Sequence, residues 1–303
     1  MYKEIDSNKR RTIFLMMVFL VFVIGMGYLL ALYFNNMFIL VVAVVVAVVQ
    51  ALVSCYASDS ITLSISGANE VPKKEPYLEL HRLVENLAIT AGIPKPRIFV
   101  IADSAPNAFA TGRDPKHASI AVTTGLLEKL NKQELEGVIA HEMSHIGNYD
   151  IRLMTVIVVL VGVVALLSDF FMRWTWFGGG KRSNDSDSGN SQLQLILFVV
   201  AIILAILAPI IATIIQLSIS RKREYLADAS GALLTRYPEG LASALEKISK
   251  DPDSLEVANK ATAHLYIASP FKTKESGSSG FMVGLFETHP PITDRVKKLR
   301  AMI

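Results

Sequence analysis

Four long apolar runs constrain the fold of this chain more than any other feature of its sequence. Two of them, residues 13–34 and 37–57, contain no charged side chain, and a short polar link separates them. A third run, 151–172, carries charges only near its ends, and a fourth, 193–219, carries none. A helix needs about 20 apolar residues to cross a hydrocarbon core of about 30 Å. We therefore expect four transmembrane helices, the first two of them forming a hairpin.

The composition supports a membrane protein and excludes several other classes. Of the 303 residues, 51% are hydrophobic and 19% are charged, against about 25% charged in soluble proteins. A mean hydropathy of +0.41 excludes a disordered chain. The net charge of +3 is too small to suggest nucleic-acid binding. The single cysteine, Cys55, excludes an intramolecular disulfide and a cysteine-rich zinc site. The first run is too long for a cleaved signal peptide and leads straight into a second span.

Basic residues beside the apolar runs predict how the chain is oriented. Lysine and arginine gather in the N-terminal tail, residues 1–12, and directly after the fourth run at 221–223, whereas the first hairpin turn has none. The positive-inside rule then places the tail and the segments 58–150 and 220–303 in the cytoplasm, with a loop outside between the third and fourth runs. We expect the two segments to combine into one α+β domain with a small β-sheet. Residues 97–102 and 119–123 have the alternation and β-branched content of strands, and residues 107–110 could form an edge strand between them.

The chemistry is concentrated in a helix predicted over residues 131–149. Asn131 and Glu134 have the spacing of a capping box, and residues 141–145 read His-Glu-Met-Ser-His. Side chains four apart share one helix face, so His141 and His145 can bind one Zn²⁺. Zinc acidifies a bound water and polarises a carbonyl, and Glu142 is placed to take a proton and pass it on. The alternative is two surface histidines on a charged helix, but apolar neighbours on this helix favour burial.

A catalytic zinc site needs a third protein ligand, for which Glu224 is the best candidate. His145 precedes the third apolar run by a few residues, and Glu224 follows the fourth by a few. Two adjacent antiparallel spans would bring them together near the cytoplasmic membrane surface. Asp228 lies four residues after Glu224 and could accept the outer N–H of a zinc-bound histidine. The alternative is an exposed pair of carboxylates beside three basic residues.

Together these segments resemble the HtpX-type membrane metalloproteases, which are relatives of the CAAX prenyl proteases. The resemblance also rests on residues 107–112 (Asn-Ala-Phe-Ala-Thr-Gly) and on His289-Pro290-Pro291 with Arg295. It covers nearly the whole chain and implies a zincin-like (gluzincin) protease domain in the inner membrane of a bacterium. The implied activity is zinc-dependent cleavage of misfolded or damaged membrane proteins at the cytoplasmic face.

The resemblance also implies roles for residues that the motifs alone leave open. Asn107 and its neighbours would line the substrate cleft, as an edge strand that could pair with an extended peptide. His289 would lie near the zinc and contact the substrate or the oxyanion, and Arg295 would support the zinc helix. From the residues alone, Asn107 could equally belong to a plain loop and His289 to a surface loop.

A membrane scaffold that binds zinc without catalysis is the alternative function. Structural zinc sites normally have four protein ligands, whereas this sequence offers three obvious ones, which favours an open catalytic position. A channel or transporter would need polar or broken spans, and the spans here have almost none. We therefore expect membrane-protein or peptide substrates and the lipid bilayer as partners, with one zinc ion per chain and no nucleic acid.

Overall fold

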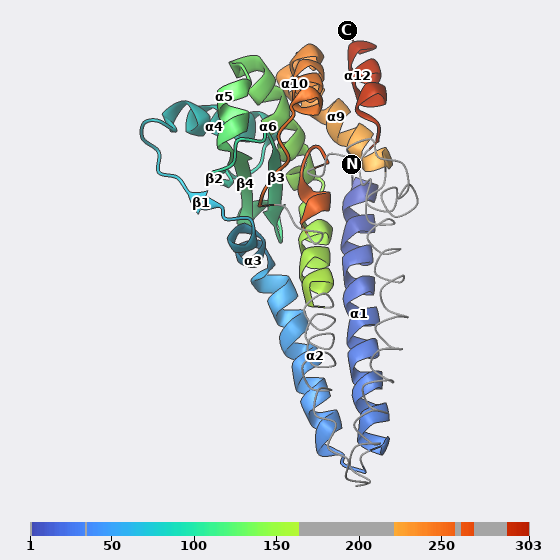
Figure 1. Ribbon diagram of the computed structural model, residues 1–303. Helices are drawn as coiled ribbons and strands as arrows, with labels where there is room; N and C mark the ends of the chain where they lie inside the picture. Colours follow the sequence, from blue (N-terminus) through green and yellow to red (C-terminus); the bar gives the residue numbers. More distant parts are fainter. Residues whose placement is uncertain (1, 34, 164–220, 258–261, 270–289, 303) are drawn as a thin grey trace, which may run out of the picture.

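The computed structural model describes residues 2–33, 35–163, 221–257, 262–269 and 290–302. Two long helices extend away from a mixed part that contains a small sheet surrounded by helices (Figure 1). The expected fourth span at 193–219, the end of the third, the loop between them and His289 lie outside the described residues. Within them, the chain is mostly helical, in agreement with the expected fold class.

The predicted hairpin is a pair of antiparallel helices, α1 (Tyr2–Tyr33) and α2 (Phe38–Tyr56). Both are long and apolar enough to cross a membrane, over Ile5–Leu32 and Phe38–Tyr56. Only 6% and 11% of the most apolar 18-residue stretch in α1 and α2, respectively, is buried inside the protein. Most of the apolar side chains in these stretches are therefore free to face lipid. Helix α1 begins at Tyr2, so residues 2–12 continue the first span as about three further helical turns.

The third apolar run begins as a helix over Asp150–Val163, which is bent by 84° from the preceding helix Lys132–Gly147. Its side chains at 153–159 are all buried, among them those of Leu153 and Ile157. These two helices are long and apolar enough to cross a membrane only if both are counted together as one bent span. The described residues thus contain two helices that could span a membrane, or three with the bent pair, against the four expected.

The sheet has four strands in the order β1-β2-β4-β3. The two central strands, β2 (Arg97–Ile101) and β4 (Ala118–Thr123), run parallel and coincide to within one residue with the strands expected from alternation and β-branched content. The two edge strands, β1 (Asn69–Glu70) and β3 (Ala108–Gly112), are antiparallel to their neighbours. Residues 108–110 therefore do belong to an edge strand, as their sequence suggested.

Both faces of the sheet are buried, each against a different set of helices. Ile98 and Val100 point into the larger core, which contains side chains of the zinc-motif helix and of the helices around it. Phe99 and Ile101 point to the opposite side, toward the helix Asp150–Val163. The period of two residues along β2 produces this division.

Besides the helix Asp150–Val163, the described structure contains seven further helices and two 3₁₀ turns: α3 (Ser58–Ile65), α4 (Leu78–Ala91), α5 (Thr124–Lys129), α6 (Lys132–Gly147), α9 (Arg221–Thr235), α10 (Pro238–Lys250), α12 (Ile292–Arg300), η1 (Pro115–His117) and η2 (Ala263–Leu265).

Helix α6 begins with the predicted capping box. The side chain of Asn131 accepts a hydrogen bond from the backbone amide of Glu134, and the side chain of Glu134 accepts one from the backbone amide of Asn131. It lies against α9, and the absence of a side chain at Gly231 lets the two backbones approach closely. A Cβ atom there would lie 3.0 Å from the backbone nitrogen of His141.

Candidate metal centre

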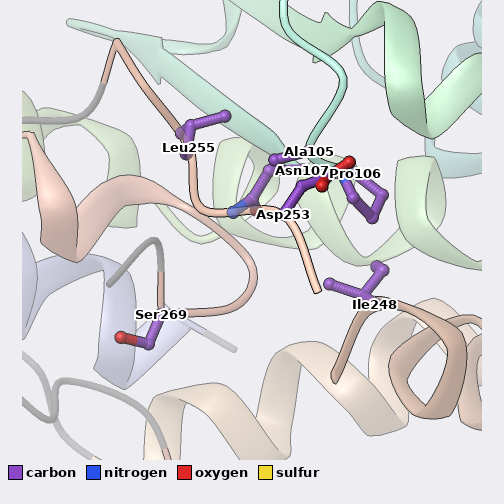
Figure 2. A pocket seen from close by; sticks show the side chains of 7 residues that line it. All are labelled: Ala105, Pro106, Asn107, Ile248, Asp253, Leu255 and Ser269. Carbon is purple, nitrogen blue, oxygen red and sulfur yellow. The ribbon is translucent and has the colours of Figure 1, made fainter. Parts of the chain in front are cut away.

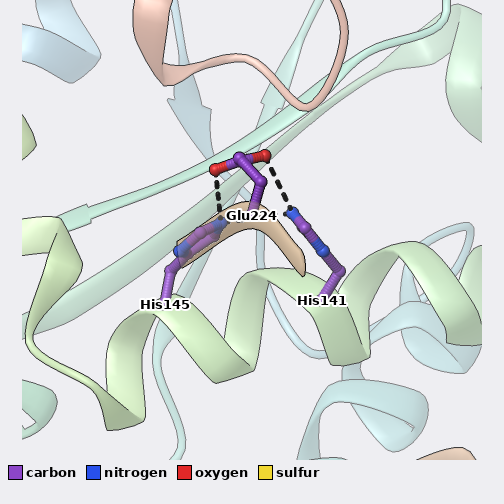
Figure 3. A group of neighbouring side chains, drawn as sticks. All are labelled: His141, His145 and Glu224. Carbon is purple, nitrogen blue, oxygen red and sulfur yellow. Dashed lines mark hydrogen bonds and ion pairs between the residues drawn. The ribbon is translucent and has the colours of Figure 1, made fainter. Parts of the chain in front are cut away.

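Two histidines of α6 and one glutamate of α9 converge on a single point (Figure 3). The Nε2 atoms of His141 and His145 are 3.1 Å apart. The carboxylate of Glu224 lies 3.5 Å from Nε2 of His145 and 3.9 Å from Nε2 of His141. All three residues are buried, and one ligand atom of each lies within 4.8 Å of the other two. The structure thus brings together the three residues that the sequence predicts as ligands.

The Nδ1 atom of each histidine contacts a carboxylate. Nδ1 of His141 lies 3.0 Å from Oδ1 of Asp228, and Nδ1 of His145 lies 3.0 Å from Oδ2 of Asp150. Because an ionised carboxylate only accepts hydrogen bonds, each Nδ1 must carry a proton. The Nε2 lone pairs of two neutral rings would then face each other across 3.1 Å. Such an arrangement requires a cation between them.

In the absence of a metal, a proton can serve as that cation. Burial lowers the pKa of His141 to about 4. Burial acts in the same direction on His145, but its hydrogen bond to Asp150 and the charge of Glu224 outweigh it and raise the pKa to about 9. The pair therefore shares one proton around neutral pH, and a metal ion would have to displace it.

The spacing of the donor atoms fits zinc. Nitrogen ligands 2.0–2.1 Å from a tetrahedral zinc lie about 3.3 Å from each other. The distances of 3.1 and 3.5 Å that Nε2 of His145 makes to His141 and Glu224 are close to this value. Two imidazoles and one carboxylate are also a donor set that catalytic zinc sites use. Among the described residues, the group contains three potential ligands, which is the number that a catalytic zinc site takes from the protein.

Glu142 follows the first histidine and is also buried. Burial raises the pKa of its carboxyl group to about 7, and the charge of Glu224 acts in the same direction. The backbone amide of Ala110, in edge strand β3, opposes this shift through a hydrogen bond. A carboxyl group with a pKa near neutrality can both accept and donate a proton in a reaction cycle. Its contact with β3 also places it beside the edge of the sheet that β3 forms.

Arg295 of α12 lies behind Asp228 and is fully buried. Its Nε and one terminal nitrogen donate to the two carboxylate oxygens of Asp228 at 2.9 and 2.7 Å, and its other terminal nitrogen donates to the carbonyl of Ile267 at 3.0 Å. Burial alone would raise the pKa of Asp228, but Arg295 and the hydrogen bond with His141 lower it to about 2. Arg295 therefore keeps Asp228 ionised and oriented toward His141.

Asn107 lies at the start of the edge strand and is buried. Its Nδ2 donates to the carbonyl of Ala268 at 3.2 Å, and the amide of Ile267 donates to the carbonyl of Ala108 at 3.0 Å. The chain's own segment 262–269 thus covers the first part of this edge. Asn107 also lines a small pocket (Figure 2) whose lining residues are Ala105, Pro106, Asn107, Ile248, Asp253, Leu255 and Ser269. Its expected contact with substrate stays a prediction, and His289 lies outside the described residues.

Asp150 is the neighbour of the centre that sequence reasoning missed. It follows His145 by five residues, a spacing that does not place two side chains on one helix face. The contact arises because the chain turns sharply after α6, with Tyr149 in a left-handed conformation at φ 60°. An acidic residue between the motif helix and the next apolar run was visible in the sequence, but nothing local signalled the turn that returns it to His145.

Comparisons with known proteins show the family to which this chain belongs. The profile of peptidase family M48 matches residues 74–303. A protease HtpX homolog of Caldanaerobacter subterraneus subsp. tengcongensis is 44% identical, covering 100% of this chain and 98% of the relative. Homologs of the same name from Listeria monocytogenes and Dictyoglomus thermophilum are 44% identical (100% of both chains) and 46% identical (99% of this chain, 94% of the relative). The crystal structure of S. mikatae Ste24p is 20% identical, with a TM-score of 0.49 over 99% of this chain and 67% of that one. This chain therefore belongs to peptidase family M48, as a metalloprotease of the HtpX type.

Proposed function

We propose that this metalloprotease uses one zinc ion to cleave misfolded or damaged membrane proteins at the cytoplasmic face of the bacterial inner membrane. His141, His145 and Glu224 would hold the zinc. The observation that carries this assignment is the convergence of the two Nε2 atoms and the Glu224 carboxylate while both Nδ1 atoms are engaged by carboxylates. The guanidinium of Arg295 lies 3.5 Å from Nε2 of His141 and 3.9 Å from Glu224, and a metal ion between the three ligands would satisfy all of them at one point.

Each of the surrounding residues would have its own role in peptide hydrolysis. When bound, zinc polarises the scissile carbonyl and acidifies water. Glu142 takes the proton of the attacking water and delivers it to the leaving amine, for which a pKa of about 7 is suited. Asp228 and Asp150 hold the imidazoles in the tautomer whose Nε2 is free to ligate. The burial of all these groups strengthens their electrostatic interactions.

Edge strand β3 is the surface that we propose for the substrate backbone. The carbonyl of Ala108 is already engaged by Ile267, and the amide of Ala110 acts on Glu142. The amide of Gly112 lies 3.4 Å from the hydroxyl of Thr155. An extended peptide would have to displace such contacts to pair with β3 by main-chain hydrogen bonds. Such pairing would recognise unfolded segments with little regard for their side chains, which suits the degradation of damaged proteins.

The proposed orientation rests on where the N-terminal end of α1 lies. This end is at the same end of the molecule as the sheet domain (Figure 1). The ammonium group of Lys9 lies 4.6 Å from the ring centre of Tyr149, which directly follows α6. The basic residues at the start of α1 and the metal centre would thus be on one side of the bilayer. The positive-inside rule makes this side the cytoplasm.

Substitution of Glu142 by glutamine tests the proposed chemistry. The amide keeps the shape of the side chain but cannot accept the proton, so cleavage of a membrane-protein substrate should fall by about 10²–10⁴-fold. The zinc content should stay that of the wild type, because Glu142 is not a proposed ligand. Glu136→Gln, on the same helix, is the matched control and should retain activity.

Wild-type rates in Glu142→Gln would contradict this mechanism. A wild-type chain that binds zinc through four protein ligands and cleaves nothing would instead support the inactive scaffold.

A further inference from the structure

Asn8 is a buried polar residue in α1, a helix that otherwise presents many exposed apolar side chains. Its Nδ2 donates to Oδ1 of Asp150 at 2.6 Å and to the backbone carbonyl of Asn148 at 3.1 Å. These partners lie 142 and 140 residues away in the sequence. A buried side-chain amide is costly unless it is hydrogen-bonded, so these contacts define where the start of α1 must lie.

The same network reaches both helices that carry the proposed zinc ligands. The second oxygen of Asp150, Oδ2, lies 3.0 Å from Nδ1 of His145. A terminal nitrogen of Arg223 donates to Oδ1 of Asn8 and to Oδ1 of Asp150, both at 3.3 Å. Arg223 directly precedes Glu224 in α9 and is itself buried. Asn8 is thus linked to His145 by hydrogen bonds through a single residue, Asp150.

The donors around Asp150 decide which of its oxygens is available to His145. Oδ1 receives hydrogen bonds from Asn8 and Arg223, which leaves Oδ2 for the imidazole. Without the amide of Asn8, the carboxylate could rotate and pair with Arg223 through both oxygens, a geometry that arginine favours. His145 would then lose the acceptor that fixes its ring orientation and tautomer.

We propose that Asn8 is a positioning residue that couples the packing of α1 against the sheet domain to metal binding at His145. The proposal rests on the proposed function, because it takes His145 as a zinc ligand. Among the described residues, Asn8 contacts none of the proposed metal ligands and acts through Asp150 and Arg223. Zinc affinity therefore depends on how α1 packs against the domain, so that displacement of this helix weakens the site.

An exchange of the two side chains tests this coupling in the purified full-length chain. Asn8→Asp is isosteric but removes the donor and places a second carboxylate beside Asp150. Zinc affinity, measured by competition with a chelator, should fall about tenfold, the lower range for loss of a group that supports a ligand. In Asn8→Asp/Asp150→Asn the new amide donates to residue 8, and its oxygen accepts from His145. Its N–H group then faces the donor of Arg223, and residue 8 no longer donates to the carbonyl of Asn148, so this double variant should recover only part of the affinity that Asn8→Asp loses.

Thr12→Val is the matched control. Thr12 is buried one turn along α1, and its hydroxyl donates to the backbone carbonyl of Asn8 without reaching Asp150. Its zinc affinity should equal that of the wild type. Thermal unfolding of each variant without metal separates loss of affinity from loss of folding. If Asn8→Asp does not fold, Asn8→Ala removes the same donor without adding a charge.

Each outcome distinguishes the coupling from the function on which it rests. Wild-type affinity in Asn8→Asp would overturn the coupling and leave the zinc site intact, whereas a wild type that binds no zinc would overturn the site itself. If the exchanged double variant binds zinc no better than Asn8→Asp, the amide has only a structural role and the proposal is wrong.

Discussion

At the scale of single residues, the two histidines of α6 differ in pKa although both are buried on the same helix. Burial dominates at His141 and lowers its pKa to about 4. At His145, Asp150 and Glu224 overcome burial and raise the pKa to about 9. Between these limits, the pair should carry one shared proton that competes with a metal ion.

Zinc affinity should therefore depend on pH in a defined way. Because one proton must leave for the metal to bind, the apparent affinity should rise about tenfold per pH unit between pH 6 and pH 8. It should level off above pH 9, where His145 has already lost its proton. Chelator competition at a series of pH values measures this slope. An affinity independent of pH over the whole range would show that no shared proton exists.

Asp228 is predicted to matter for stability as well as for the orientation of His141. Asp228→Asn would leave the guanidinium of Arg295 buried without its anionic partner. Breaking a buried ion pair on one side costs about 3–5 kcal/mol of unfolding free energy, which denaturant or thermal unfolding can detect. Asp228→Asn/Arg295→Met, which removes both charges, should be more stable than Asp228→Asn. If Asp228→Asn is as stable as the wild type, Arg295 does not depend on this carboxylate.

Local spacing predicts part of the centre, and the expected pairing of the third and fourth apolar runs brought Glu224 to the histidines. His141 and His145 are four apart on one helix, and so are Glu224 and Asp228, so helical periodicity alone relates each pair. The structure brings all four together. Asp150 and Asn8 could not be found in this way. Their contacts depend on a sharp turn after α6 and on the packing of α1, which no local pattern encodes.

At the scale of elements, the centre depends on how closely α6 and α9 approach. Gly231→Ala would place a Cβ atom 3.0 Å from the nitrogen and 3.1 Å from the Cα of His141. The two helices must then separate slightly, which moves Glu224 away from the histidines. We expect this variant to lose both thermal stability and zinc affinity.

Gly137→Ala is the control for this prediction. A Cβ atom there would lie 2.6 Å from the backbone nitrogen of Leu241, so the contact that is disturbed is between α6 and α10. We expect a loss of thermal stability, with zinc affinity retained in the folded fraction. Equal losses of affinity in both variants would mean that the spacing of α6 and α9 has no special role.

Among the elements, helices and central strands were predictable because their patterns are strong. The capping box marks the start of α6, and β-branched alternation marks β2 and β4 within one residue. The beginning of α1 was not predictable in the same way. Residues 2–12 are polar enough to be expected as a tail, yet they form a helix whose inner face packs against the domain through Asn8 and Thr12.

At the scale of the whole molecule, the apolar helix pair and the sheet domain occupy opposite ends (Figure 1). We expect the turn between α1 and α2 to face the outside and the domain to face the cytoplasm. With Cys55 replaced by serine, a cysteine at exposed Asn36 should react with a membrane-impermeant maleimide in intact cells. A cysteine at exposed Lys116 should react only after permeabilisation. The opposite labelling pattern would reverse the proposed orientation.

The number of spans is described only in part. Apolar length predicts four, and the described residues contain two such helices, or three with the bent pair, while the fourth run lies outside them. The third run shows how apolar length can have more than one cause. Its first turns pack against the sheet and against α1, so apolarity there reflects a protein core as much as a lipid contact. Length and composition cannot separate these two uses of apolar side chains.

A zinc-edge anomalous difference map from crystals of the metal-loaded chain would locate the ion itself. We expect one peak per chain, about 2 Å from Nε2 of His141, Nε2 of His145 and a carboxylate oxygen of Glu224, with its fourth position open to solvent. A peak elsewhere, or one at which Glu224 makes no bond to the ion, would contradict this expectation.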